Sequence, residues 1–127
     1  MAHFLKPLLS AKAASVLVNS RTGGVVASAL ELATDSSSRN KGLLGREGLQ
    51  EGAALVLAPC STVHTFFMRF SIDVLFAGRD GRVLKIVRGV PPWRLAARLG
   101  AFAVLEFQSG WLDSVDIQEG DFLLLKS

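Results

Sequence analysis

The sequence has few of the residues that cross-link a chain or bind metal. Its 127 residues contain one cysteine, two histidines and no tyrosine. The lone Cys60 excludes an intrachain disulfide. Cys60, His64 and His3 together cannot supply the four ligands of a closed zinc site, so we expect no metal and no cofactor.

Long apolar runs are also missing, although the mean hydropathy is +0.38. No stretch reaches the roughly 18 apolar residues of a spanning helix. At the amino terminus, Lys12 interrupts the apolar stretch before it reaches the roughly 7 to 15 residues of a signal-peptide core. These absences predict a cytoplasmic protein with no membrane partner.

The sequence lacks an internal repeat, which excludes solenoids and propellers. It also lacks a phosphate loop, a dinucleotide-binding fingerprint and a nucleophile elbow. The Gly-Leu-Leu-Gly segment at 42–45 is too short for a phosphate loop and is not followed by Lys-Ser/Thr. The common nucleotide-binding enzymes are therefore not indicated.

What is present is apolar surface. Hydrophobic residues make up 50% of the chain, with eight Phe and two Trp, which is enough to offset the entropy of ordering. The length fits one domain over 1–127, with 1–12 as a flexible tail. We expect a monomer.

Short apolar runs separated by turn residues predict strands. The expected strands are 15–18, 24–33, 53–58, 62–70, 72–76, 83–88, 101–107 and 121–125. Asp80-Gly81 lies between two such runs and predicts a hairpin. The pattern predicts a mainly β fold, a compact barrel or sandwich of antiparallel strands with one or two short helices.

Helical signals are few. Thr34 or Asp35 can cap a helix over 36–44 that stops at Gly45. A weaker helical turn is expected over 93–98, after Pro91-Pro92, and at most a single turn over 113–117.

The net charge is +3, and six of the 14 basic residues lie within the segment 79–98. Six cations are opposed there only by Asp80, and they are Arg79, Arg82, Lys85, Arg88, Arg94 and Arg98. RNA binding through 79–98 is one interpretation, and it predicts affinity that falls steeply with salt. Because only Trp93 accompanies the cluster, a solvated surface is favoured over nucleic acid.

Polar and apolar side chains alternate along the segment 64–76. Read as one extended strand, its even positions form an apolar face, whereas Arg69, Ser71 and Asp73 share the other. These polar residues either face water or line a sheltered cleft. A Cys60–His64 thiolate pair is disfavoured, because four residues of strand span about 13 Å.

Glu106 lies within the apolar run 103–107. A carboxylate there either faces water or pairs with a cation such as Arg46 or Arg69. If Asp73 and Glu106 converged, they could perform acid/base chemistry, but the structural ion pair is favoured.

Several blocks, in this order, resemble the DUF192 family over about 33–125. They are 39–46 (Arg-Asn-Lys-Gly-Leu-Leu-Gly-Arg), 64–76 (His-Thr-Phe-Phe-Met-Arg-Phe-Ser-Ile-Asp-Val-Leu-Phe), 104–110 (Val-Leu-Glu-Phe-Gln-Ser-Gly) and 120–121. Matched motif positions are Gly42, Leu43, Leu44, Arg46, Met68, Arg69, Ser71, Ile72, Asp73, Leu105, Glu106 and Gly110. Leu44 and Ser71 stand where the family usually has Met and Pro, and the loop between Met68 and Asp73 is shorter than in the commoner form. The resemblance implies a small, mainly β domain of no assigned function, in a family with many exported members.

We therefore expect a non-enzymatic module that binds a small polar ligand or a partner. Its cleft would use Arg69, Asp73 and Glu106, with His64 and Arg46 nearby. The alternatives are a hydrolase-like enzyme with Asp73 or Glu106 as general base, and RNA binding through 79–98.

Overall fold

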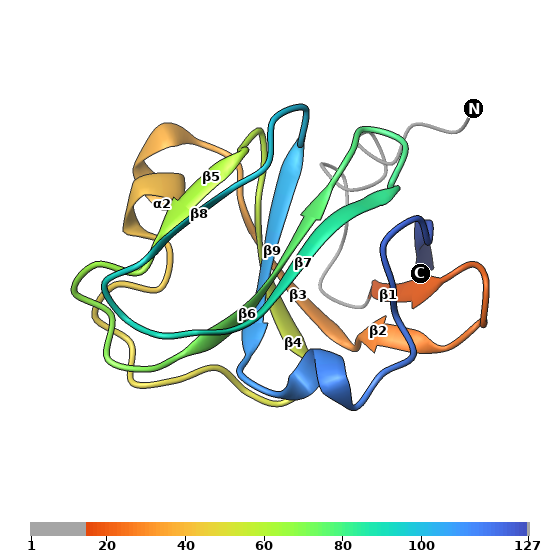
Figure 1. Ribbon diagram of the computed structural model, residues 1–127, viewed down its shortest axis with the longest axis horizontal. Coiled ribbons are helices and arrows are strands. Elements are labelled where there is room, and N and C mark those ends of the chain that lie inside the picture. Colours follow the sequence, from red (N-terminus) through yellow and green to blue (C-terminus); the bar gives the residue numbers. More distant parts are fainter. Residues whose placement is uncertain (1–14, 127) are drawn as a thin grey trace.

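The computed structural model describes residues 15–126 as a mainly β fold of three open sheets (Figure 1). The five-stranded sheet contains, in spatial order, β3 (Ala29–Ala33), β4 (Ala53–Leu57), β9 (Ala103–Gln108), β6 (Ile72–Ala77) and β7 (Val83–Val90). This arrangement confirms the predicted mainly β class in its sandwich-like form, not as a closed barrel. The tail expected over 1–12 lies outside the described residues.

Two smaller sheets flank the central one. The first has the order β10 (Leu123–Lys126), β1 (Val16–Asn19) and β2 (Val25–Ala27). The second pairs β5 (Thr62–His64) with β8 (Leu95–Ala97). A 3-10 turn, η1 (Trp111–Asp113), follows β9.

The middle strands of the five-stranded sheet are buried on both faces, because both are covered. All six residues of β6 are buried, and the runs in β4 and β9 are almost continuously apolar. Such runs are typical of strands with no solvent-facing side. The strands pair antiparallel except for β3 and β4, which are parallel and therefore need a crossover connection.

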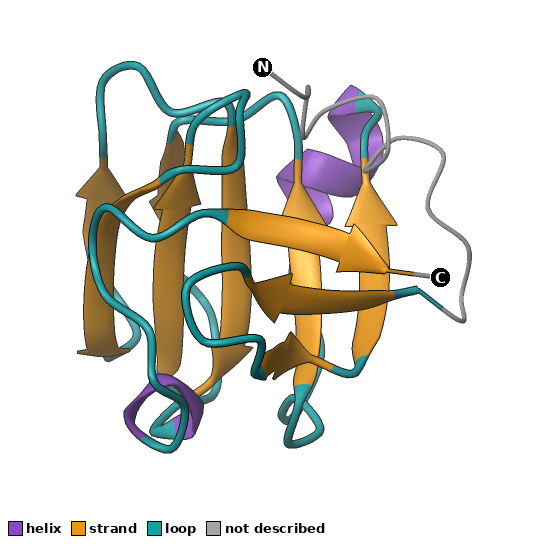
Figure 2. Ribbon diagram, turned by 90° about the vertical axis from the view of Figure 1, so that its right-hand side faces the viewer, coloured by secondary structure: helices purple, strands orange, loops and turns teal. Residues whose placement is uncertain are grey.

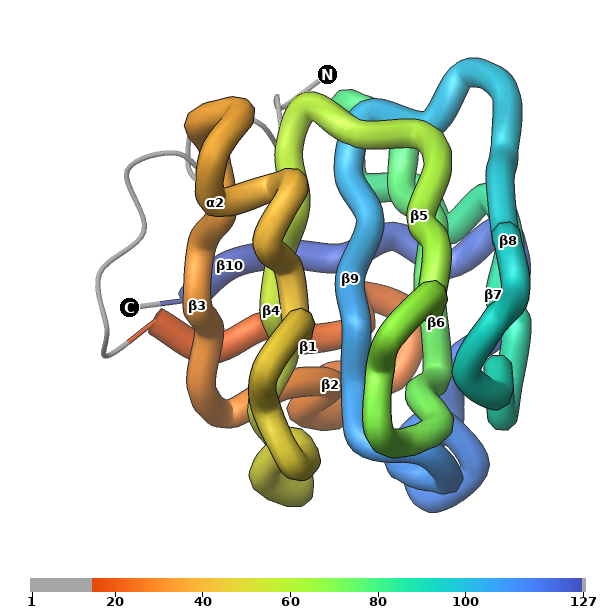
Figure 3. Tube along the Cα trace, turned by 90° about the vertical axis from the view of Figure 1, so that its left-hand side faces the viewer, coloured from red at the N-terminus to blue at the C-terminus, as the bar shows by residue number. Residues whose placement is uncertain are grey.

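The sheet has two separate apolar cores. On one face, β1, β2 and β10 cross the central strands at a steep angle (Figure 2) and bury a core around Leu17, Leu75 and Phe107. The other face is covered by the crossover segment and by β5 and β8 (Figure 3), over a core that includes Val74 and Val104.

The crossover begins with one short helix, α2 (Ser36–Lys41). The Asp35 side chain accepts a hydrogen bond from the Ser38 amide at 2.7 Å, which confirms Asp35 as the N-cap. The helix ends at Lys41 and is capped by Gly42, with φ of 48°, so the predicted extension to 44 is wrong. The hairpin at Asp80-Gly81 forms as predicted, because the Gly78 amide donates to the Arg82 carbonyl.

Three further local predictions are wrong. The strand expected over 24–33 is divided into β2 and β3, which belong to different sheets. The strand expected over 62–70 ends at His64, and a tight loop leads to Ile72, so 64–76 is not one alternating strand. Phe67 has φ of 65°, which interrupts any extended run. The helical turn expected over 93–98 is the strand β8, because its residues pair with β5.

No helix within 15–126 has both the length and the apolar character to cross a bilayer.

Candidate functional site

Asp73 and Glu106 lie on neighbouring strands but point to opposite faces of the sheet. In the register of β6 and β9, Asp73 is opposite Phe107 and Glu106 is opposite Val74. Because successive side chains of a strand alternate between faces, residues one step apart in this register cannot share a face. The two carboxyls predicted to form one site therefore do not converge.

Asp73 has a structural role. Its side chain is fully buried and accepts three backbone amides, from Gly89 at 2.8 Å and from Gly110 and Leu112 at 3.0 Å each. These bonds tie β7 and the turn after β9 to β6. With both oxygens occupied, Asp73 anchors two segments and is not placed to bind a ligand.

The two arginines proposed for the site have other partners. Arg46 forms an ion pair with Glu31, and Arg69 lies 3.7 Å from Glu47 with both side chains largely exposed. Neither forms the predicted ion pair with Glu106. Exposed pairs such as that of Arg69 stabilise a protein by little.

Glu106 is buried with 3% of its surface exposed, and its Oε1 has no hydrogen-bond partner among residues 15–126. Burial raises the pKa of Glu106 to about 7, and the attraction of Arg46 opposes that rise. A buried polar atom without a partner costs about 1–3 kcal/mol, so such groups often mark sites that bind something.

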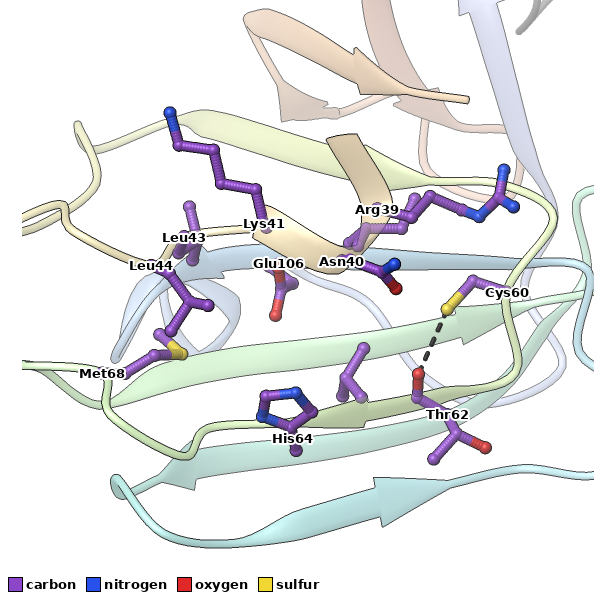
Figure 4. A pocket seen from close by; sticks show the side chains of 13 residues that line it. Arg39, Asn40, Lys41, Leu43, Leu44, Cys60, Thr62, His64, Met68 and Glu106 are labelled. Carbon is purple, nitrogen blue, oxygen red and sulfur yellow. Dashed lines mark hydrogen bonds between the residues drawn. The ribbon is translucent and has the colours of Figure 1, made fainter. Parts of the chain in front are cut away.

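Glu106 lies in a cleft of about 170 Å³ between the crossover segment and β5. The Glu106 carboxyl and the His64 imidazole are directed toward the same space (Figure 4), whereas the charged ends of Arg39 and Lys41 point away from Glu106. Apolar walls come from Leu43, Leu44, Leu57, Val63 and Met68. Asn40, Cys60 and Thr62 complete the polar part of the lining.

This arrangement can donate or accept a proton or a hydrogen bond near neutral pH. A carboxyl with a pKa of about 7 is present in both forms there. The Cys60 thiol donates to the Thr62 carbonyl at 3.1 Å. Within the described part of the chain, no three His, Cys, Asp or Glu side chains gather so that they could hold a metal ion.

Of the five residues proposed from the sequence, the cleft contains only His64 and Glu106. Asn40 and the wall residues Leu43 and Leu44 were not proposed for the site. Their signal was present, because the segment 39–46 is one of the blocks that carry the family resemblance.

The fold and the site together define a class of protein, a small β sandwich with a cleft built around one buried carboxyl. The chain belongs to the DUF192 family, described as "Uncharacterized ACR", whose model matches residues 17–125. No functionally curated protein matches the chain.

Two solved structures are similar to this chain. A protein of unknown function from Novosphingobium aromaticivorans is 25% identical, with a TM-score of 0.74 over 87% of this chain and 82% of that one. A Sinorhizobium meliloti protein, whose name suggests a transcription regulator, is 21% identical, with a TM-score of 0.76 over 87% and 90%. The second likeness concerns the fold alone.

Proposed function

We propose that this protein binds a small polar molecule in the cleft around Glu106, without a covalent step. The observation that carries the proposal is the Glu106 Oε1 atom, buried in the cleft with no partner among residues 15–126. A ligand that donates a hydrogen bond to this oxygen removes the cost of burying it.

The cleft limits the ligand in size and chemistry. Its volume of about 170 Å³ is close to the roughly 150 Å³ of a cavity that holds benzene, so the ligand has about six to ten non-hydrogen atoms. The Glu106 Oε1 atom in the cleft favours a ligand with a hydrogen-bond donor, such as a hydroxyl, amide or amine. Leu44, Val63 and Met68 favour a compact apolar part beside that donor.

The hydrolase-like alternative is less well supported. It uses Asp73 or Glu106 as general base, and Asp73 accepts three backbone amides on the other face of the sheet. Glu106 alone has the pKa of a general acid or base, but no second carboxyl from residues 15–126 lines its cleft.

The experiment measures binding of small probes by thermal shift and by calorimetry. Benzylamine, benzyl alcohol, benzamide and benzoate present an amine, a hydroxyl, an amide and an acceptor beside an apolar ring, in molecules of about eight to nine non-hydrogen atoms that match the cleft. We expect at least one donor probe to bind wild type and to bind Glu106→Gln at least tenfold more weakly, because Gln changes the charge and the donor pattern at the floor.

Glu47→Gln is the matched control, since Glu47 is 89% exposed and lies outside the cleft. It should bind the probe like wild type. If no probe binds wild type, or if Glu106→Gln binds as well as wild type, the proposal is wrong. Chemical conversion of a bound ester or amide probe that is lost in Glu106→Gln would instead support the enzymatic alternative.

A further inference from the structure

A second feature is a group of rings at the end of β5 and on two loops, which we call the aromatic cluster: His64, which also lines the Glu106 cleft, Phe66, Phe67 and Trp93. Phe67 meets Trp93 edge to face with ring centroids 4.6 Å apart, and Phe66 stacks against Trp93 at 5.9 Å and His64 at 5.0 Å. Phe67 is 72% exposed and Trp93 is 56% exposed. Large rings are seldom presented to water in this way without a function.

The backbone holds these rings outward in an unfavourable conformation. Phe67 and Trp93 have φ of 65° and 70°, and no other described non-glycine residue has a positive φ. Bulky residues keep such angles only where the surroundings impose them, and such places are often functional. The Phe67 and Trp93 rings are thus held where ordinary packing would not put them.

Hydrogen bonds to Thr65 hold the two loops in this conformation. Thr65 is buried, its hydroxyl donates to the Pro91 carbonyl at 2.6 Å, and the same oxygen accepts from the Arg94 amide at 2.9 Å. Its carbonyl accepts the Trp93 amide at 3.0 Å and the Met68 amide at 3.2 Å. Thr65 therefore joins the two loops into one rigid unit.

The surface around the aromatic cluster is basic and partly aliphatic. The segments 60–72 and 90–99 contain Arg69, Arg94 and Arg98 but no Asp or Glu. Leu95 is opposite His64 in the β5–β8 pair and is 67% exposed. Exposed rings, an exposed aliphatic side chain and three arginines thus occur together in these two segments, with Arg69 3.7 Å from the exposed Glu47.

We propose that the aromatic cluster is a docking surface for an anionic lipid bilayer, with Phe67, Trp93 and Leu95 entering the interface and Arg69 and Arg94 contacting lipid phosphates. Trp at the level of the headgroups and Arg beside anionic lipid are recurrent features of membrane surfaces. The charge of the surface is complementary to such lipids.

Three observations favour a bilayer over a single-stranded nucleic acid. Leu95 adds aliphatic area that base stacking does not use, and the Phe67–Trp93 pair forms a wedge instead of a flat stacking face. In addition, every backbone amide of 91–94 is either absent, as in the two prolines, or hydrogen-bonded within the protein. Because these amides are already paired, the free-energy cost of moving this backbone from water into the lipid interface is reduced.

The test is co-sedimentation of the full chain with vesicles of phosphatidylcholine alone or mixed equally with phosphatidylglycerol. We expect binding to the mixed vesicles only. In a Trp111→Phe background, the fluorescence emission of Trp93 should shift to the blue on binding and should be quenched by brominated lipid. Phe67→Gly removes the ring in a backbone conformation that glycine accepts, so folding is preserved. It should weaken partitioning by roughly tenfold or more, the factor expected for burial of a Phe side chain.

Arg69→Ala and Arg94→Ala should each weaken binding to the mixed vesicles by about fivefold. Val25→Ser and Arg82→Ala are the matched controls, because both residues are exposed and lie on other elements, and they should bind like wild type. Binding unchanged by Phe67→Gly would overturn the proposal. So would binding of wild type to an oligothymidylate but not to the mixed vesicles.

Discussion

The two faces of the five-stranded sheet each bury one carboxyl, one residue apart in register, and surround it differently. Asp73 is 0% exposed and Glu106 is 3% exposed, so burial does not separate them. Asp73 accepts three backbone amides, whereas Glu106 has an oxygen with no partner among residues 15–126. The two carboxyls therefore differ in their hydrogen bonding and not in their burial.

The hydrogen bonds of a buried carboxyl indicate its role. A carboxylate whose lone pairs are occupied by amides belongs to the architecture, because removing it leaves those amides unpaired. A carboxyl that is desolvated and incompletely bonded, and that opens onto a cleft, is costly to the fold, and a ligand can offset that cost. Both readings can be tested by substitution.

The largest effect is expected for Asp73→Ala. It leaves the amides of Gly89, Gly110 and Leu112 without an acceptor, and we expect a loss of about 3–5 kcal/mol in the free energy of unfolding. Urea denaturation measures this loss. Asp113→Ala removes an exposed carboxylate paired with Arg88 and should cost less than about 1 kcal/mol. Equal losses in the two variants would contradict the structural role of Asp73.

Glu106→Gln should change the pH dependence of stability. The pKa of Glu106 rises from 4.5 in the unfolded chain to about 7 in the folded protein, so the folded state holds the proton more tightly. Wild-type stability should therefore fall as pH rises from about 4.5 to 7, by about 3 kcal/mol in total. Glu106→Gln removes this slope. Parallel urea midpoints for the two proteins across that range would show that Glu106 is not desolvated.

A smaller effect of opposite sign is expected for Asp121. It is bonded to Arg21 at 2.7 Å and to Asn19 at 2.7 Å, which lowers its pKa from 3.8 to about 2. Its contribution is present above pH 3.8 and is lost as pH falls through 2. Because the Arg21 side chain is 40% exposed, screening limits the contribution to roughly 1 kcal/mol. Asp121→Asn should flatten this acid limb in urea titrations, and an unchanged limb would assign it to other groups.

Features set by local chemistry could be predicted from the sequence. The Asp35 cap and the Asp80-Gly81 hairpin each depend on a few neighbouring residues, and both formed as expected. Glu106 was recognised as unusual because it interrupts an apolar strand. Its expected partner Arg46 instead pairs with Glu31, which the sequence places 15 residues away with no local signal.

Features set by long-range pairing could not be predicted. Residues 95–97 form a strand only because 62–64 lie beside them. The amides that occupy Asp73 come from positions 16, 37 and 39 residues further along the chain. The aromatic cluster was missed for the same reason, since Trp93 meets Phe66 and Phe67 only after the Thr65 hydrogen bonds bring the loops together.

The parallel pairing of β3 with β4 has a consequence for how this scaffold can be altered. Parallel neighbours cannot be joined by a tight turn, so the 34–52 connection has to travel over the sheet, and on its way it forms one wall of the Glu106 cleft. Outside Leu43, which is buried in the core, and Leu44 and Leu49, which pack against it, this wall does not have to follow the two-residue periodicity of a strand. Insertions or exchanges there can reshape the mouth of the cleft while the pairing of the strands beneath it stays the same.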